Sequence, residues 1–242
     1  MFSEEQLARI LFLDIETARG QYHFNDLSPA LQALWSQKAE KIRNSKEDTP
    51  EMVYEDKAGI YAEFGKIICI SFGFLTFAQG QPYFRVKSFY SSDEKEILSA
   101  FGELLDRKFK GWQLCAHNGK EFDFPYMGRR FLINQIALPE ILQVQGKKPW
   151  EVSFLDTMEL WKFGDYKNYT KLELLCALFE IPTPKDDIDG SQVGRVYWEE
   201  KDLPRIAHYC EKDVIATAQV LLKYCILPGL SEAHIQSATQ AN

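Results

Sequence analysis

The sequence predicts an α/β protein in which a mixed central sheet of about five strands is covered by helices on both faces. Two short apolar runs, residues 10–14 and 112–118, have the length and composition of buried strands. Residues 66–77 and 83–90 are rich in β-branched and aromatic residues and flank a polar break, which predicts a β-hairpin. Beyond this hairpin, segments with helical spacing alternate with short strands, and this order favours a mixed sheet over an all-α or all-β protein.

Each element can be assigned along the chain. After the first strand, residues 17–63 are mostly polar, and we interpret them as an insertion that contains one helix, 29–43, and a loop. The apolar spacing then predicts helices at 93–109, 121–133, 156–163, 172–179 and 204–225 and a short strand at 152–156. Pro125 is tolerated in the first turn of its helix, and Asp156 with Glu159 forms a potential capping box. We expect a single domain over residues 1–242.

Composition limits the possible classes of protein. The chain has 242 residues, of which 45% are hydrophobic and 26% are charged, so it can bury a core without disulfides and is neither disordered nor fibrous. The N-terminal apolar run is short and lacks a basic region, and no window is long enough to span a membrane. We therefore expect a soluble, cytoplasmic protein with no membrane contact.

Charge and cysteine content limit the partners. The sequence has 28 Lys and Arg against 35 Asp and Glu, a net charge of −7, so binding of nucleic acid would need a local site or bound metal ions. The five cysteines are widely spaced without a CxxC pair. We interpret them as reduced core residues of an intracellular protein.

Three acidic motifs stand out. Asp14 and Glu16 close the first strand, and residues two apart project from the same face of a strand. Asp123 follows the strand at 112–118 near a helix N-terminus, where it could simply cap the helix. Tyr209 and Asp213 are four residues apart on the last helix and therefore share a face. Each motif alone also fits solvated or capping acids, so the argument depends on all three together.

Together these motifs resemble the DEDD superfamily of 3′–5′ exonucleases. Asp14-Ile15-Glu16-Thr17 resembles the first motif, Asn118 to Asp123 the second, and Tyr209 to Asp213 the third. Residues 155–159 and 181–193 further resemble stand-alone bacterial exonucleases related to the proofreading domain of family B DNA polymerases. The resemblance implies a ribonuclease H-like fold. It also implies two divalent ions, Mg²⁺ or Mn²⁺, held by the carboxylates of Asp14, Glu16, Asp123 and Asp213.

Two branches of the superfamily differ in the third motif. One carries His five residues before the Asp, the position of His208, and the other carries Tyr four residues before it, the position of Tyr209. Five residues on a helix turn about 140° away from the starting face, whereas four turn only about 40°. If the helix begins near residue 204, Tyr209 shares a face with Asp213, which favours the tyrosine branch and a Tyr209 that orients the attacking water.

The resemblance also implies substrate contacts. Thr17, Asn118 and Phe122 would contact the terminal nucleotide, and an aromatic ring stacks on any base, as an enzyme that removes every nucleotide requires. Lys185 resembles a lysine that meets a phosphate, although it is equally an ordinary loop residue.

The expected function is therefore metal-dependent 3′–5′ exonuclease activity on single-stranded or frayed DNA. An RNA exonuclease of the same architecture remains an alternative, as does, from another class, a catalytically silent nucleic-acid-binding module. The intact acids at all four positions argue against the silent module. A polymerase or repair partner acting in trans is a further expectation.

Overall fold

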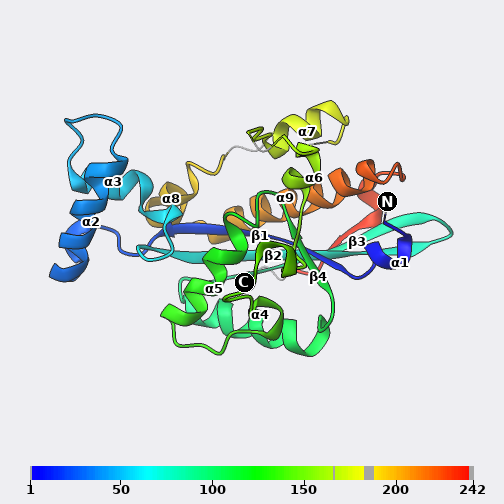
Figure 1. Cartoon of the computed structure of the whole chain (residues 1–242), viewed down its shortest axis with the longest axis horizontal. Coiled ribbons are helices and arrows are strands. Elements are labelled where there is room, and N and C mark those ends of the chain that lie inside the picture. The colour runs from blue at the N-terminus through cyan, green and yellow to red at the C-terminus, as the bar shows by residue number, and fades with distance from the viewer. Residues whose placement is uncertain (1, 166, 183–187, 240–242) are drawn as a thin grey trace.

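The computed structural model describes residues 2–165, 167–182 and 188–239, and its centre is a six-stranded mixed sheet (Figure 1). The strand order is β5-β4-β1-β2-β3-β6. The strands are β1 (Ile10–Arg19), β2 (Gly65–Ala78), β3 (Gln81–Tyr90), β4 (Gln113–Ala116), β5 (Leu155–Asp156) and β6 (Ile235–Ser237). β1 pairs antiparallel with β2 and parallel with β4, so the sheet is mixed, as the sequence predicts.

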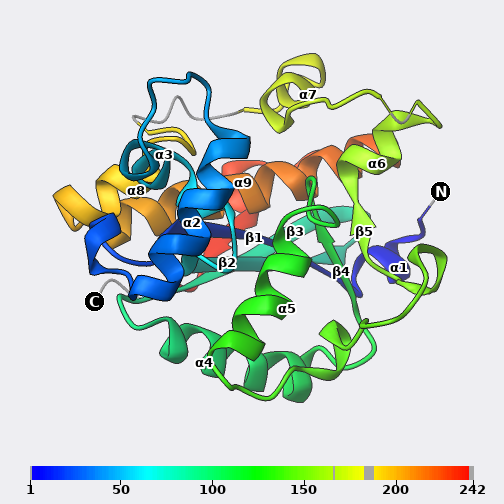
Figure 2. The same cartoon turned by 60° about the vertical axis from the view of Figure 1, so that its left-hand side comes forward.

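Helices cover both faces of this sheet. They are α1 (Glu4–Leu7), α2 (Pro29–Ile42), α3 (Pro50–Lys57), α4 (Glu94–Lys108), α5 (Asp123–Ile133), α6 (Thr157–Lys162), α7 (Leu172–Leu178), α8 (Val193–Arg195) and α9 (Leu203–Tyr224). Alternate residues of β1 enter opposite layers: Leu11 and Leu13 pack with α4 and α5, whereas Phe12 packs with α9. The α/β prediction with both faces covered is confirmed, and Figure 2 shows α4 and α5 on the opposite side of the sheet from α9.

The hairpin β2–β3 has the turn that its sequence predicts. Gln79 and Gly80 both have positive φ, 52° and 75°, which is the backbone of a two-residue type I′ turn. Glycine suits the second position because it adopts positive φ without a steric penalty. This turn fixes the register in which Ser71 of β2 faces Ser88 of β3.

The insertion begins later than the sequence indicates. β1 continues through Arg19, which pairs with Gly65, so Thr17 still belongs to the sheet and the strand extends slightly beyond the expected boundary at about residue 17. Helices α2 and α3 then enclose a small core of their own around Trp35 and Tyr54. The indole Nε1 of Trp35 donates a 2.9 Å hydrogen bond to the Pro50 carbonyl and ties the two helices together.

The number of strands and the N-terminal cap of α6 differ from the prediction. β6, three residues long, pairs with β3 and makes six strands rather than about five. Asp156 does cap α6, but the Glu159 carboxylate pairs with Lys120 at 2.6 Å and leaves the expected capping box incomplete. No helix in the described part of the chain combines the length and apolar character that a membrane crossing requires.

A buried ion pair between Glu94 and Arg130 connects the elements of the layer that contains α4 and α5. The Glu94 carboxylate accepts hydrogen bonds from Arg130 Nε at 2.9 Å, from the Ile67 backbone at 2.7 Å and from Asn134 Nδ2 at 2.7 Å. Arg130 Nη1 donates to the Ala62 carbonyl at 2.8 Å. The pair therefore connects α4, α5, the start of β2 and the end of the insertion.

Candidate active site

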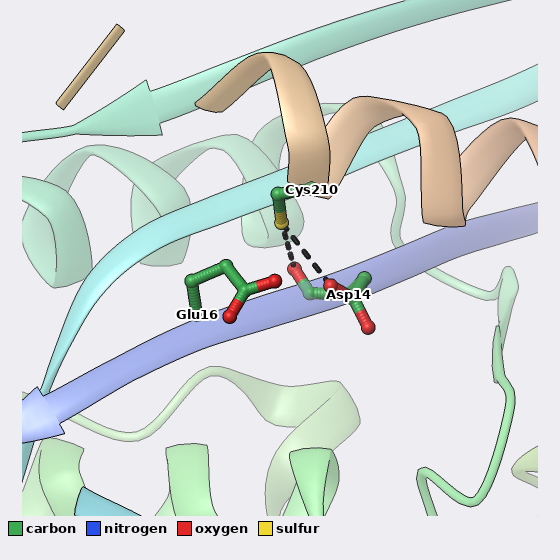
Figure 3. Close-up of side chains that lie close together, drawn as sticks. All are labelled: Asp14, Glu16 and Cys210. Atoms are coloured by element: carbon green, nitrogen blue, oxygen red, sulfur yellow. Dashed lines mark hydrogen bonds between the residues drawn. The ribbon is translucent and has the colours of Figure 1, made fainter. Parts of the chain in front are cut away.

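Two carboxylates of β1 form the centre of the site. Asp14 and Glu16 project from the face of β1 that α9 covers, and Glu16 is only 8% exposed. The ladder with β2 shifts register between Glu16 and Thr17, which is a β-bulge directly beside the acids. Figure 3 shows that the two side chains lie next to each other, with the Cys210 thiol of α9 against Asp14.

Asp123 contacts the same strand from α5, which lies on the opposite side of the sheet from α9. It lies in the first turn of α5 and is 3% exposed. β4 ends at Ala116, and the backbone N–H of Ile15 donates to Asp123 Oδ1 at 3.1 Å, between Asp14 and Glu16. Asp123 is therefore more than a helix cap, because its carboxylate fixes the loop after β4 to β1.

Helix α9 contributes Tyr209 and Asp213. The helix starts at Leu203, so positions 208 and 209 both lie in regular helix, as predicted. Tyr209, Asp213 and Asn118 line one pocket of about 340 Å³, at the low end of the size of small-ligand sites. His208 is exposed and does not line this pocket.

The acids repel one another. Burial raises the pKa of Asp14 and Glu16 well above their usual values, and each is raised further by Asp123 and Asp213. Burial is also the main cause that raises the pKa of Asp123 to about 7. In the described part of the chain, Asp14, Glu16 and Asp123 form no ion pair with Lys, Arg or His. Among the described residues, these three acids therefore lie together without a salt-bridge partner.

Cys210 was interpreted as an ordinary core cysteine, but it contacts the acids. Its Sγ lies 3.2 Å from Asp14 Oδ2 and 3.4 Å from the Asp14 carbonyl. Burial raises the pKa of the Cys210 thiol, so the thiol is protonated and donates to Asp14. Among the described residues, the potential metal ligands whose donor atoms lie within 4.8 Å of one another are those of Asp14, Glu16 and Cys210, rather than those of all four predicted acids.

The loop after β4 is held by Asp156. Asp156 Oδ1 and Oδ2 accept from the backbone N–H of Asn118 at 2.9 Å and of Lys120 at 3.0 Å. Asn118 has φ 63°, a left-handed conformation that Asn tolerates better than most residues. Its Oδ1 is buried without a hydrogen-bond partner in the structure, so an acceptor remains available beside the pocket.

The remaining predicted substrate residues have different surroundings. Thr17 hydrogen-bonds Tyr126 with its side chain, and Phe122 is half-buried with its ring centroid 5.3 Å from that of Tyr126. Neither Thr17 nor Phe122 lines the pocket that contains Asn118. Lys185 lies outside the described residues.

Part of the pocket was not expected from the sequence. Tyr169, Thr170 and Lys171 form one rim, and Tyr169 is 62% exposed. His117 holds this rim, because its Nδ1 lies 2.8 Å from Thr157 Oγ1 and its Nε2 lies 2.9 Å from the Thr170 carbonyl. Residues 169–171 have no periodic sequence pattern that would predict their place at the pocket. The sequence signal that relates to them is the pair His117-Asn118 directly after β4.

The chemistry of these donors fits hard divalent cations. The side chains that meet here offer carboxylate oxygens, the ligands that Mg²⁺ and Mn²⁺ prefer. Burial, and after it repulsion from the neighbouring acids, raises the pKa of these carboxyl groups, so the folded chain disfavours their charged forms. A bound cation would relieve this repulsion, so the arrangement can hold a metal ion.

Comparison with solved structures agrees with this fold. The family B DNA polymerase from the hyperthermophilic archaeon Pyrobaculum calidifontis matches with a TM-score of 0.57 at 14% identity, over 90% of this chain. The chain spans about a quarter of that polymerase, since the match covers 24% of it. The fold is therefore ribonuclease H-like, like that of the exonuclease domain of a family B DNA polymerase. A search of curated proteins finds no match.

A family model supplies the relationship. The model described as a predicted 3′–5′ exonuclease related to the exonuclease domain of PolB matches residues 60–241. This range contains Asn118, Asp123, Tyr209 and Asp213, and the fold adds Asp14 and Glu16 from β1, which precedes it. The match covers well over half of the chain, so this protein belongs to the family of predicted 3′–5′ exonucleases related to the exonuclease domain of PolB.

Proposed function

We propose that this protein is a metal-dependent exonuclease of the tyrosine branch that removes nucleotides from the 3′ end of single-stranded or frayed DNA. The observation that carries the proposal is the convergence of Asp14, Glu16 and Asp123, without a neutralising protein cation, beside a pocket lined by Tyr209 and Asp213. The family indicates the reaction class, which is 3′–5′ exonuclease hydrolysis, and the acids are the residues that would bind the metal ions for it.

The metal ligands follow from the placement of the acids. Asp14, Glu16 and Asp213 would hold one divalent ion, and Asp14 would bridge to a second that has Asp123 beside it. When bound, two such ions neutralise charge on the scissile phosphate and lower the pKa of water. The chain's own contribution is to fix the carboxylates: the Ile15 N–H holds Asp123, and the Cys210 thiol holds Asp14.

Tyr209 would orient the attacking water with its hydroxyl. Burial, followed by repulsion from Asp213, raises its pKa above the usual value, so the hydroxyl keeps its proton at neutral pH and can donate. It faces the pocket together with Asp213, whereas His208 is exposed. These positions favour Tyr209 over His208.

Asn118 is the strongest candidate for substrate binding. Its free Oδ1 could accept from a sugar hydroxyl or base N–H of the terminal nucleotide. Thr17 would contribute through its backbone at the bulge, Phe122 through its half-buried ring and Lys185 through a phosphate. Tyr169 and Lys171 on the rim add a second ring and a cation to this set.

DNA is favoured over RNA because the matched polymerase is a DNA polymerase. The activity would stand alone or serve a polymerase or repair partner in trans, in the cytoplasm. The two alternatives are an RNA exonuclease and a silent nucleic-acid-binding module, and neither is favoured by a contact in the site.

The direct test is hydrolysis of 5′-labelled single-stranded DNA and RNA with Mn²⁺ or with excess chelator. We expect stepwise shortening of DNA from the 3′ end with Mn²⁺, none with chelator and none on an oligonucleotide whose 3′ hydroxyl is blocked. Asp213→Ala should abolish the reaction, whereas Glu159→Gln, a change of a half-exposed acid outside the site, should retain it. Faster shortening of RNA would establish the RNA alternative, and binding without hydrolysis would establish the silent module.

A second assay separates the two branches. Tyr209→Phe keeps the ring and loses only the hydroxyl, so the rate should fall by about ten- to a thousandfold without being abolished. His208→Ala should leave the rate within about twofold of wild type, because this side chain lies in solvent. An inactive His208→Ala beside a normal Tyr209→Phe would place the protein in the histidine branch.

A further inference from the structure

A second candidate binding surface lies at the Arg19 end of β1, outside the pocket. It combines three cations with three aromatic rings, which we call the cation–aromatic cluster: Arg19, Tyr22, Lys66, Tyr197, Trp198 and Lys201. These residues come from the end of β1, the start of the insertion, the start of β2 and the segment that follows α8. Figures 1 and 2 both place α8 and the insertion helix α3 at this end of the molecule.

The rings hold the cations in defined positions. Lys66 Nζ lies 4.8 Å from the Tyr197 ring centroid and 5.1 Å from that of Trp198. Lys201 Nζ lies 5.0 Å from the Trp198 centroid, and Arg19 Cζ lies 5.1 Å from that of Tyr22. A ring face attracts a cation through its quadrupole but carries no net charge. The contacts therefore order the cations and leave their positive charge in place.

Carboxylates do not neutralise this charge. Among the described residues, none of Arg19, Lys66 and Lys201 forms an ion pair with an acid. Glu200, next to Lys201 in the chain, instead pairs with Arg195 at 3.2 Å and Arg205 at 2.6 Å. In a chain of net charge −7, these residues are a group of three cations without an ion-paired acid among the described residues.

A purely structural role explains only part of the cluster. The Trp198 Nε1 donates to the Arg19 carbonyl at 3.1 Å and joins the segment after α8 to the sheet. That contact accounts for Trp198 and for the Tyr22 ring 5.5 Å from it. The fold also holds two of the cations, because Arg19 Nε donates to the Tyr22 carbonyl at 2.7 Å and Lys66 Nζ donates to the Ser92 carbonyl at 3.4 Å, but carbonyl acceptors leave the positive charge of these side chains in place.

The cluster also lies on the same strand as the proposed metal ligands. Arg19 follows Glu16 by three residues, which places it about 10 Å further along β1 at the rise of a strand. A nucleic-acid strand whose 3′ end lies at Glu16 spans that distance within its next few nucleotides.

We propose that the cation–aromatic cluster binds the single-stranded nucleic acid upstream of the terminal nucleotide. Lys66, Lys201 and Arg19 contact phosphates, and the half-buried Tyr22 and Trp198 rings hold these cations in position. This inference rests on the proposed exonuclease function. It adds a substrate-binding subsite that lies partly outside the range matched by the family model, because Arg19 and Tyr22 precede residue 60.

The test compares two double variants. Lys66→Gln with Lys201→Gln removes two cations of the cluster. Lys38→Gln with Lys148→Gln is the matched control, because Lys38 Nζ lies 3.7 Å from the Tyr61 ring centroid and Lys148 Nζ lies 5.2 Å from that of Trp150, outside the cluster. Both variants lose the same charge and the same kind of contact. The substrates are a thymidine dinucleotide and an oligothymidylate of about a dozen nucleotides.

We expect the cluster variant to raise KM for the long substrate about tenfold, with kcat and dinucleotide hydrolysis unchanged. The slope of log(kcat/KM) against log[salt] should become shallower by about 1.4 for the long substrate, since each lost phosphate contact of a single strand contributes about 0.7. The control variant should match wild type in both respects. Each single variant, Lys66→Gln and Lys201→Gln, should give a smaller change in the same direction, which excludes misfolding of the double variant as the cause.

The outcomes separate the two proposals. Wild-type activity on both substrates, with the same KM in the cluster variant, would overturn the cluster inference and leave the exonuclease function standing. Equal losses on the dinucleotide and the long substrate would also overturn it, because an upstream subsite cannot act on a dinucleotide. Wild-type protein that hydrolyses neither substrate would overturn the proposed function together with this inference.

Discussion

Glu94 and Asp123 are carboxylates of neighbouring helices that are 6% and 3% exposed, yet only Glu94 has a cation against it. Arg130 and two further donors satisfy the Glu94 oxygens. Asp123 accepts hydrogen bonds from the backbone of Ile15 and from its own backbone N–H, and the charged groups that raise its pKa are the acids Asp156 and Asp213. Within the described ranges, the fold thus supplies a cation to Glu94 but none to Asp123.

This difference shows how to recognise a functional acid among buried ones. A buried charge is costly, so a fold selected for stability alone pairs it or replaces it. Three acids that raise one another's pKa contribute nothing favourable to the fold unless a cation joins them. The lack of compensation is therefore the physical sign of a binding site.

The largest expected effect concerns the compensated pair. Arg130→Met removes the partner of a buried carboxylate, which typically costs about 3–5 kcal/mol of unfolding free energy. Urea unfolding should show this loss with or without Mn²⁺, because neither Glu94 nor Arg130 is a proposed metal ligand. A variant as stable as wild type would show that Glu94 does not depend on Arg130 and would weaken the comparison.

The next effect concerns the uncompensated site and pH. Asp123 has its pKa raised to about 7, against 3.8 in a model peptide, so the native state holds a proton that the unfolded state has released. Stability in chelator should therefore fall as pH rises from about 4 to about 7, relative to Asp123→Asn, which cannot titrate. At pH 8 we expect Asp123→Asn to be more stable than the wild-type protein, measured by thermal unfolding. A constant difference from pH 5 to 8 would contradict the assigned burial of this charge.

The smallest effect concerns Cys210. Cys210→Ala removes the thiol that donates to Asp14 and should cost up to about 1.5 kcal/mol in chelator. Cys210→Ser retains a donor and should lie between Cys210→Ala and wild type. Hydrolysis by both variants should persist with Mn²⁺, since the carboxylates remain. Loss of activity in Cys210→Ser would show that the sulfur itself takes part in the site.

Much of this arrangement could be predicted from the sequence because it depends on local patterns. Apolar runs identified β1 and β4, and the polar break identified the hairpin turn. The spacing of Tyr209 and Asp213 placed them on one face of α9 once the helix start was known, and both line the same pocket. These features follow from periodicity within one element.

The rest depends on contacts between elements. β6 has three residues and lies at the sheet edge, too short for an alternating pattern to appear. Cys210 lies between Tyr209 and Glu211 in the sequence, and only the packing of α9 on β1 brings it to Asp14. Asp156 was recognisable as a cap, but its bonds to the loop at 118–120 connect residues almost forty positions apart. A single sequence carries no signal for such pairs.

Calorimetric titration of Mn²⁺ at pH 6.5, repeated in buffers of different ionisation enthalpy, tests the central claim most directly. We predict binding by the wild-type protein with release of protons, because ligands whose pKa values are raised must lose their protons to the metal. Asp14→Asn should bind at least tenfold more weakly and release fewer protons, whereas Glu159→Gln should match wild type. No Mn²⁺ binding, or equal binding by Asp14→Asn, would contradict the assignment of these uncompensated acids as a metal site.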